Sequence, residues 1–128
     1  MISNEVKKII QSVDVEGIDP TMVFSYALPK SLQSSISDKI VILINDVSNP
    51  PVVYGSNEVE YKKGTVQVQF FYPPSIDGDV TTLYEDPITK ELRKNQWYQT
   101  VGGGVDREPT TYQLYTTYHF QKNIKQTI

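Results

Sequence analysis

Two groups of carboxylates are the side chains of this sequence that could most readily do acid–base or metal chemistry. They are Asp14, Glu16 and Asp19 in one segment, and Asp77, Asp79, Glu85 and Asp86 around an expected second helix. Neither group has the spacing of a calcium-binding loop with its terminal glutamate. Asp77 and Asp79 are more simply explained as charges at a helix N-terminus. We therefore predict no metal site, and a hydrolase with a carboxylate pair stays open as an alternative.

The single histidine, His119, lies in an expected strand with no serine or acid close to it in sequence. Because catalytic triads are assembled in space, sequence alone does not decide whether His119 belongs to one. We expect it to be a surface or hydrogen-bonded side chain. One histidine and zero cysteines exclude multi-histidine and thiolate metal sites within one chain. We predict no catalytic residues and no cofactor.

The three consecutive glycines, Gly102–Gly104, are the part of the sequence most similar to a phosphate-binding loop. Such a loop needs a helix after it, so that the amides of the helix N-terminus point at the anion. Here a strand containing Pro109 is expected to follow instead. We therefore predict that the glycines form the flexible tip of a hairpin.

An aromatic strand is the third feature with possible chemistry. It carries Tyr112, Tyr115, Tyr118 and Phe120, and its presumed partner strand carries Trp97 and Tyr98. Stacked aromatic residues can bind single-stranded nucleic acid, which we keep as an alternative function. However, Arg107 is the only basic residue between Trp97 and Phe120, and the formal net charge is −3 with a pI near 5.1. The polar face of this strand is more typical of a protein–protein surface, or of an ordinary solvent-facing side.

These residues must be positioned by a single domain, because 128 residues is a typical domain length. We assign residues 1–128 to it. The longest apolar run, Ile40–Ile44, is too short to span a membrane. The N-terminus lacks the layout of a signal peptide, so we expect synthesis in a cytoplasm.

The first half of the chain predicts a helix followed by strands. An apolar stripe indicates a helix near residues 2–13, with Ser3 or Asn4 as its N-cap. Strands are expected at 21–28 and 39–45, the second buried on both faces. Residues 46–57 contain Asn49, Pro50 and Pro51, and we predict a long loop there.

The second half predicts a hairpin, a helix and another hairpin. The first hairpin turns at Lys62–Gly64 and continues into an alternating strand that ends at Tyr72. The helix is expected to kink or break near residues 84–86, because Pro87 would interrupt it. Strands at 96–101 and 110–122 follow, separated by a loop at 102–109. The whole pattern predicts an α+β fold, a mostly antiparallel sheet of about four to six strands with two helices packed on it.

This order of elements resembles the siphovirus tail terminator, tail completion or head–tail joining proteins of Gram-positive phages and prophages. The residues that carry the resemblance are the strand end Leu28-Pro29-Lys30, the strands 40–44 and 66–72, and the helix that runs into Gln96-Trp97 before a tyrosine-rich strand. The resemblance covers nearly the whole chain. A bare α+β adaptor domain with no phage role stays open as an alternative.

The resemblance implies a non-enzymatic ring, usually a homohexamer, that caps the tail tube in the virion and meets the head connector. Its partners would be copies of itself, the major tail protein and the connector, with DNA only as cargo through an acidic lumen and no membrane. By this analogy the loops 46–57 and 102–109 would contact neighbours. The interface residues we expect are Pro50, Pro51, Tyr54, Asn57, Gly103, Val105, Arg107 and Tyr115.

Overall fold

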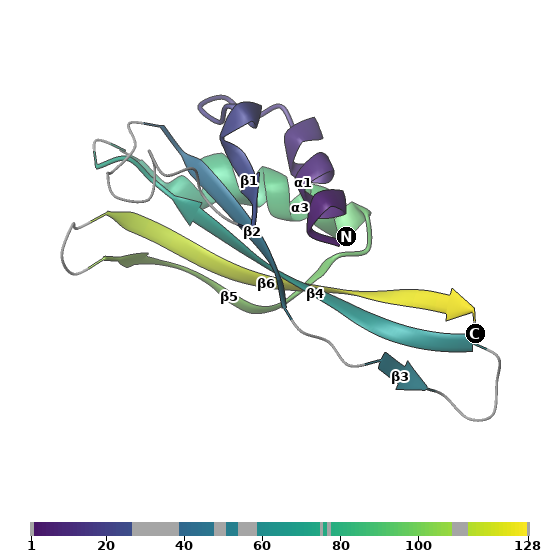
Figure 1. The fold of residues 1–128 in the computed structure, drawn as a ribbon. Helices are drawn as coiled ribbons and strands as arrows, with labels where there is room; N and C mark the ends of the chain where they lie inside the picture. The colour runs from purple at the N-terminus through teal and green to yellow at the C-terminus, as the bar shows by residue number, and fades with distance from the viewer. Residues whose placement is uncertain are drawn as a thin grey trace.

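The computed structural model describes residues 2–26, 39–47, 51–53, 59–74, 76, 78–108 and 113–127. Within these residues the chain forms a six-stranded sheet with two α-helices packed on one of its faces (Figure 1). The helices are α1 (Ile2–Ser12) and α3 (Asp86–Lys94). The strands are β1 (Val23–Ser25), β2 (Val41–Val47), β3 (Pro51–Val53), β4 (Val59–Phe71), β5 (Tyr98–Arg107) and β6 (Leu114–Thr127). The predicted α+β fold is confirmed.

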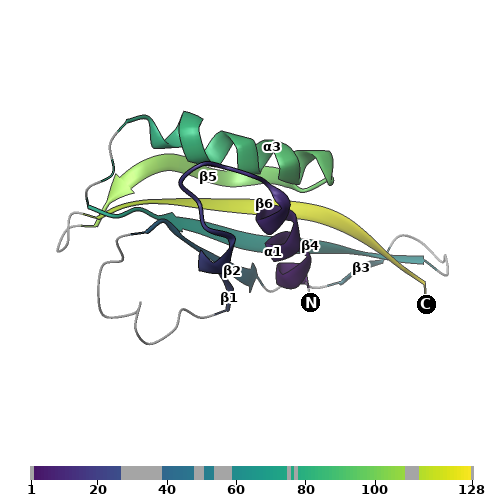
Figure 2. The ribbon, with the colours of Figure 1, turned by 90° about the horizontal axis from the view of Figure 1, so that it is seen from above.

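The sheet has the strand order β1-β2-β4-β6-β5, and β3 also pairs with β4. The pairing of β1 with β2 is parallel, and the other pairings are antiparallel. The two longest strands, β4 and β6, form the centre of the sheet. Figure 2 shows α1 lying over this centre and α3 running along β5. Because β2 and β3 pair with different parts of β4, this strand has a partner on each side along most of its length.

The hydrophobic core lies between the sheet and the helices. From the helix layer, Val6, Ile10, Ile88 and Leu92 are at most 2% exposed. From the sheet, alternate residues of β2, β4 and β6 face these helices, as period-two alternation requires. They are Ile42, Ile44, Val66, Val68, Phe70, Tyr118 and Phe120. The alternation predicted for β4 is thus confirmed.

Strand β4 runs without a turn from Val59 to Phe71, so the predicted hairpin at Lys62–Gly64 is wrong. The register pairs Lys62 with Ile124, Lys63 with Asn123 and Gly64 with Lys122 on β6. A glycine after two lysines is a turn signal only when no partner strand holds the segment extended. Here β6 does so along the whole of β4, and this long-range pairing overrides the local signal.

Gly102–Gly104 lie inside β5, so the predicted hairpin tip at these residues is wrong. All three have positive φ, and the β5–β6 register shifts between Gly102 and Val105. They are therefore an irregularity within an edge strand, which glycine permits because it tolerates positive φ. A Cβ on Gly102 would lie 2.1 Å from the carbonyl oxygen of Thr117, so the two backbones approach too closely for any other residue.

The expected loop at 46–57 is wrong for two of its parts. Strand β2 continues to Val47, and residues 51–53 form β3. Residues 48–50 and 54–58 lie outside the described part of the chain. The expected strand at 21–28 is shorter, because a 3₁₀ turn at Pro20–Met22 precedes β1, and Tyr26 with φ 74 follows it.

The start of α1 is capped by another element and not by its own side chain. Ser3 lies inside the helix, and its backbone N–H donates to Oδ1 of Asp46 on β2 at 3.0 Å. The predicted N-cap at Ser3 or Asn4 is therefore wrong. A carboxylate at this place satisfies one of the free amides and complements the helix dipole.

The second helical segment is continuous, and in place of a break it changes from π-helical to α-helical winding at the predicted residues. A π-helical turn, η2 (Thr81–Glu85), precedes α3, and Pro87 lies in the first turn of α3. Asp79 accepts bonds from the backbone N–H and the hydroxyl of Thr82, which confirms its role at a helix N-terminus. These bonds lower the pKa of Asp79. Asp77 lies outside the described residues.

Candidate functional site

The most concentrated polar chemistry in the described part of the chain surrounds Glu85, at the end of η2. Its carboxyl group is fully buried and accepts hydrogen bonds from three hydroxyls. Tyr118 donates at 2.6 Å and Thr116 at 2.7 Å from β6, and the third donor is Tyr72, directly after β4. We call these four residues the Glu85 cluster. It ties the π-helical turn to the two central strands.

Burial raises the pKa of Tyr72 and of Tyr118 above the ordinary value for tyrosine, and the hydrogen bond to Glu85 raises both further. Both phenols therefore keep their protons and act as donors over the whole physiological range. Each hydroxyl of the Glu85 cluster is already used in orienting the carboxyl group. This arrangement fixes the position of η2 on the sheet.

The other described acids of the second group, Asp79 and Asp86, do not join Glu85. Asp79 and Asp86 are exposed, whereas Glu85 is 0% exposed. The described acids of this group are thus divided between the surface and the core. In the other group, Asp14 and Glu16 are exposed, and Asp19 bonds to Thr21 and Lys39. Within the described residues, no cluster of potential metal ligands is present.

The aromatic residues of β6 are divided between the two faces of the sheet. Trp97, Tyr118 and Phe120 are at most 4% exposed in the core, so these rings are not available to stack on nucleic-acid bases. Tyr115 points to the opposite face and stacks on Phe71 of β4, with ring centroids 6.4 Å apart. Tyr112 lies outside the described residues.

The second face of the sheet is not covered by any described helix, since α1 and α3 both lie on the other side (Figure 1). We call this the open face. Its side chains alternate along the strands with those of the core and are partly exposed. They are Phe24, Leu43, Asn45, Gln67, Gln69, Phe71, Tyr115, Thr117 and His119. The mixture of aromatic, aliphatic and uncharged polar residues is typical of a protein–protein surface.

The sheet also extends beyond the helices. Residues 59–64 of β4, residues 122–127 of β6 and strand β3 continue together past the helix layer (Figure 1). We call these three segments the arm. At its base, Lys122 bonds to Glu5 of α1 at 3.0 Å and lies over the ring of Trp97. The arm is therefore anchored to the body at one end.

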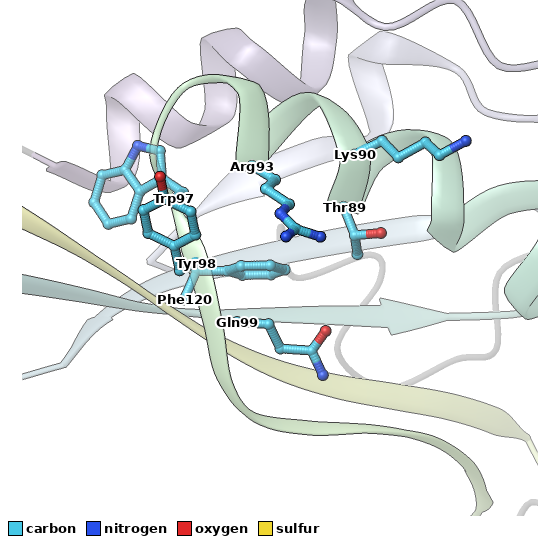
Figure 3. A pocket seen from close by; sticks show the side chains of 7 residues that line it. All are labelled: Thr89, Lys90, Arg93, Trp97, Tyr98, Gln99 and Phe120. Carbon is cyan, nitrogen blue, oxygen red and sulfur yellow. The ribbon is translucent and has the colours of Figure 1, made fainter.

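A pocket of about 310 Å³ opens between α3 and the start of β5. Figure 3 shows Arg93 and Thr89 pointing from the helix toward Gln99 and the ring of Phe120. The remaining lining residues are Lys90, Trp97 and Tyr98. The pocket combines two cations with an aromatic wall, so it can accommodate an anionic or amide side chain of a partner. Sequence reasoning missed it because its lining comes from three separate elements.

The expected interface residues that the structure describes lie on different parts of the sheet. Gly103, Val105 and Arg107 are exposed on β5, at the edge of the sheet, and Tyr115 lies on the open face. Pro51 is in β3, within the arm. Pro50, Tyr54 and Asn57 lie outside the described residues.

The chain belongs to a family described as "Protein of unknown function (DUF806)", whose model matches residues 1–125. No curated protein matches the sequence. Among the described residues, no helix is both long enough and apolar enough to cross a membrane.

Proposed function

We propose that this chain is a structural protein of a tailed phage, without enzymatic activity. In this proposal it forms a ring, capping the tail tube and joining it to the head. Its partners are further copies of itself, the major tail protein and the head connector, and DNA passes through the ring only as cargo. The resemblance to tail terminator and tail completion proteins provides the biological setting. The surface of the molecule provides the physical support.

The observation that carries the proposal is the one-sided packing of the sheet. Phe71 and Tyr115 stack on each other on the open face, where no described helix covers them. Aromatic residues bury large apolar areas and are enriched where proteins meet. We expect a subunit of a larger assembly to bind its neighbours through such a face.

Two further features agree with assembly. The arm extends away from the body, so it can reach a neighbouring subunit (Figure 2). The formal net charge of −3 is compatible with an acidic lumen that does not retain DNA. Ring closure would also bury strand edges that are exposed in a single copy.

The proposal is tested by deleting the gene from the phage or prophage that carries it. We expect particles with unjoined heads and tails, or with abnormally long tails, when lysates are counted by electron microscopy. Supplying the wild-type chain from a plasmid should restore joined virions. Normal infectious virions without the chain would overturn the proposal.

A matched pair of plasmid variants then tests the open face. Tyr115→Glu places a charge on that face, whereas Leu83→Glu places one on an exposed apolar residue of η2 on the helix side. We expect Leu83→Glu to restore joined virions and Tyr115→Glu to fail, with both variants folded by circular dichroism. Equal rescue by both variants would show that the open face is not a contact surface in the assembly.

A further inference from the structure

The two edges of the arm differ in what they offer to another chain. Strand β6 pairs with β4 along its whole length, from Tyr115 with Phe71 to Thr127 with Val59. On its other edge, β6 pairs with β5 only as far as Gln121. Residues 122–127 therefore have no partner strand on that edge among the described residues. An unpaired strand edge is a template for another strand.

Two hydrogen bonds show which backbone groups of β6 face this open edge. The N–H of Tyr72, after β4, donates to the carbonyl of Leu114 at 3.0 Å. The N–H of Glu108, after β5, donates to the carbonyl of Gln113 at 2.8 Å. Because successive residues of a strand direct their backbone groups to opposite sides, the odd-numbered residues face the β5 side. Beyond β5, these are Asn123, Lys125 and Thr127.

The same parity identifies the outer groups of β3. Even-numbered residues of β4 direct their backbone groups toward β6, so the odd-numbered Tyr61 directs its groups toward β3. Its register partner Val52 therefore directs its own backbone groups toward β4. Pro51 and Val53 therefore direct their backbone groups away from β4. Proline has no N–H, so this outer edge consists of the Pro51 carbonyl and both backbone groups of Val53.

These two edges are complementary in a parallel arrangement. Strands β3 and β6 are both antiparallel to β4, so they run in the same direction. In a parallel pair, the N–H of a residue donates to the carbonyl of the residue that precedes its opposite neighbour. The carbonyl of the same residue accepts from the N–H of the residue that follows that neighbour. With Lys125 opposite Val52 of a second copy, the Lys125 N–H meets the Pro51 carbonyl, and the Val53 N–H meets the Lys125 carbonyl. The N–H that proline lacks is not needed for these two bonds.

We propose that the open edge of β6 in one copy pairs in parallel with the outer edge of β3 in the next copy. The arms of successive copies then form one continuous sheet. This inference rests on the proposed ring function and names the contact that closes the ring. The pairing is head-to-tail, which is the kind of contact that generates rings.

One observation favours β3 of the next copy over a two-fold pairing of β6 edges, and a second shows room for an added strand. An antiparallel pair centred on Lys125 would place this lysine opposite its own copy, and like charges at that place are destabilising. A pocket of about 390 Å³ also lies at the start of β5, next to the open edge of β6. Gln96, Tyr98 and Lys122 are among its lining residues, and the pocket leaves room for side chains of an added strand.

Disulfide cross-linking tests the pairing directly, because the chain contains no cysteine. We would combine Val52→Cys with Lys125→Cys and oxidise both the purified full chain and intact particles. Within one copy, β4 separates these positions by about 9–10 Å, two strand spacings. Disulfides need Cα atoms within about 7 Å, so a bond must join two copies. We expect a ladder of multimers on a non-reducing gel, ending at the closed ring.

The controls separate this inference from the proposed function. The pair Val52→Cys with Thr82→Cys should give no ladder, because Thr82 lies in η2 on the helix side of the sheet. Dimers from Lys125→Cys alone would indicate the two-fold pairing and overturn the inference. Joined virions that contain the double variant but show no ladder would overturn it too, while leaving the ring function intact. A ladder from the purified chain, with normal virions after gene deletion, would support the pairing and contradict the function.

A second pair of variants tests the backbone bonds. Lys125→Pro removes the outward N–H but no bond to β4, whereas Lys125→Gln removes only the charge. We expect Lys125→Pro to reduce the ladder formed by cysteines at Val53 and Gln126, which this register places opposite each other, at least about tenfold relative to Lys125→Gln. Equal ladders from both variants would contradict the proposed pairing.

Discussion

The hydroxyl of Tyr118 donates a 2.6 Å hydrogen bond to Oε1 of Glu85, joining the middle of β6 to the last residue of the π-helical turn. Thr116 and Tyr72 donate to the other carboxyl oxygen. A buried polar group satisfied in this way fixes one arrangement of the elements around it. The Glu85 cluster therefore determines how the second helical segment sits on the sheet.

Glu85→Gln should lower the free energy of unfolding by about 2–4 kcal/mol. The amide would keep one acceptor oxygen, but its NH₂ group would face hydroxyls that already donate to this position. Urea denaturation measures the change. Glu91→Gln is the control, because Glu91 lies on the same helical segment and has only a long contact to Lys94 at 4.0 Å. A loss below about 0.5 kcal/mol for Glu85→Gln would show that the cluster is not structurally important.

Stability should fall as the pH rises above about 10, where tyrosines ionise in the unfolded chain. The folded protein holds the pKa of Tyr72 and of Tyr118 above that value, so it retains protons that the unfolded chain has lost. The free energy of unfolding then falls by at most about 1.4 kcal/mol per pH unit for each phenol.

Denaturation curves between pH 8 and about 11 measure this dependence for the wild type and for Tyr118→Phe. The variant should be less stable at pH 8 but lose stability less steeply above pH 10, because one of the two phenols is gone. Identical slopes would mean that Tyr118 does not carry a raised pKa.

Gln96→Gly should raise the free energy of unfolding by up to about 1 kcal/mol. Gln96 has φ 68, a left-handed conformation that glycine adopts without cost. It ends α3 in a Schellman motif, in which its N–H donates to Arg93 and the N–H of Trp97 donates to Leu92. Gln96→Ala is the control and should not stabilise the protein, because alanine has the same steric cost. Thermal unfolding distinguishes the two variants.

Gly102→Ala should destabilise the fold more than Gly104→Ala. Both glycines have positive φ, at 102 and 83, so both variants strain the backbone similarly. A Cβ at position 102 would also collide with the backbone of Thr117 and Tyr118, whereas no atom lies within 4 Å of a Cβ at position 104. We expect a difference of at least about 1 kcal/mol in the free energy of unfolding. Equal losses would show that β5 can move away from β6 at little cost.

The sequence predicts those parts of this fold that depend on local periodicity. The alternation in residues 65–72 identified the inward residues of β4 correctly, and the stripe containing Val6 and Ile10 identified the buried face of α1. Pro87 correctly indicated an irregularity in the helix before α3, which is the π-helical turn. Each of these features is set by residues close together in the chain.

The remaining features depend on partners far away in sequence. The glycine at position 64 does not turn the chain because β6 holds it in the sheet, and Asp46 caps α1 from β2. The Glu85 cluster had one local signal: Glu85, Ile88 and Leu92 are three and four residues apart, the spacing of one helix face. The π-helical turn changes the phase of the helix there, burying Glu85 while Leu83 is 51% exposed.

The position of the chain within a virion tests the central claim most directly. Because the chain has no cysteine, Thr82→Cys adds a single exposed thiol that maleimide-coated gold can label. Electron microscopy of labelled, purified particles should show gold at the head–tail junction, with several particles of gold per junction, and none on particles that carry the wild-type chain. Labelled chain recovered only as free protein, with unlabelled and fully joined virions, would contradict the account.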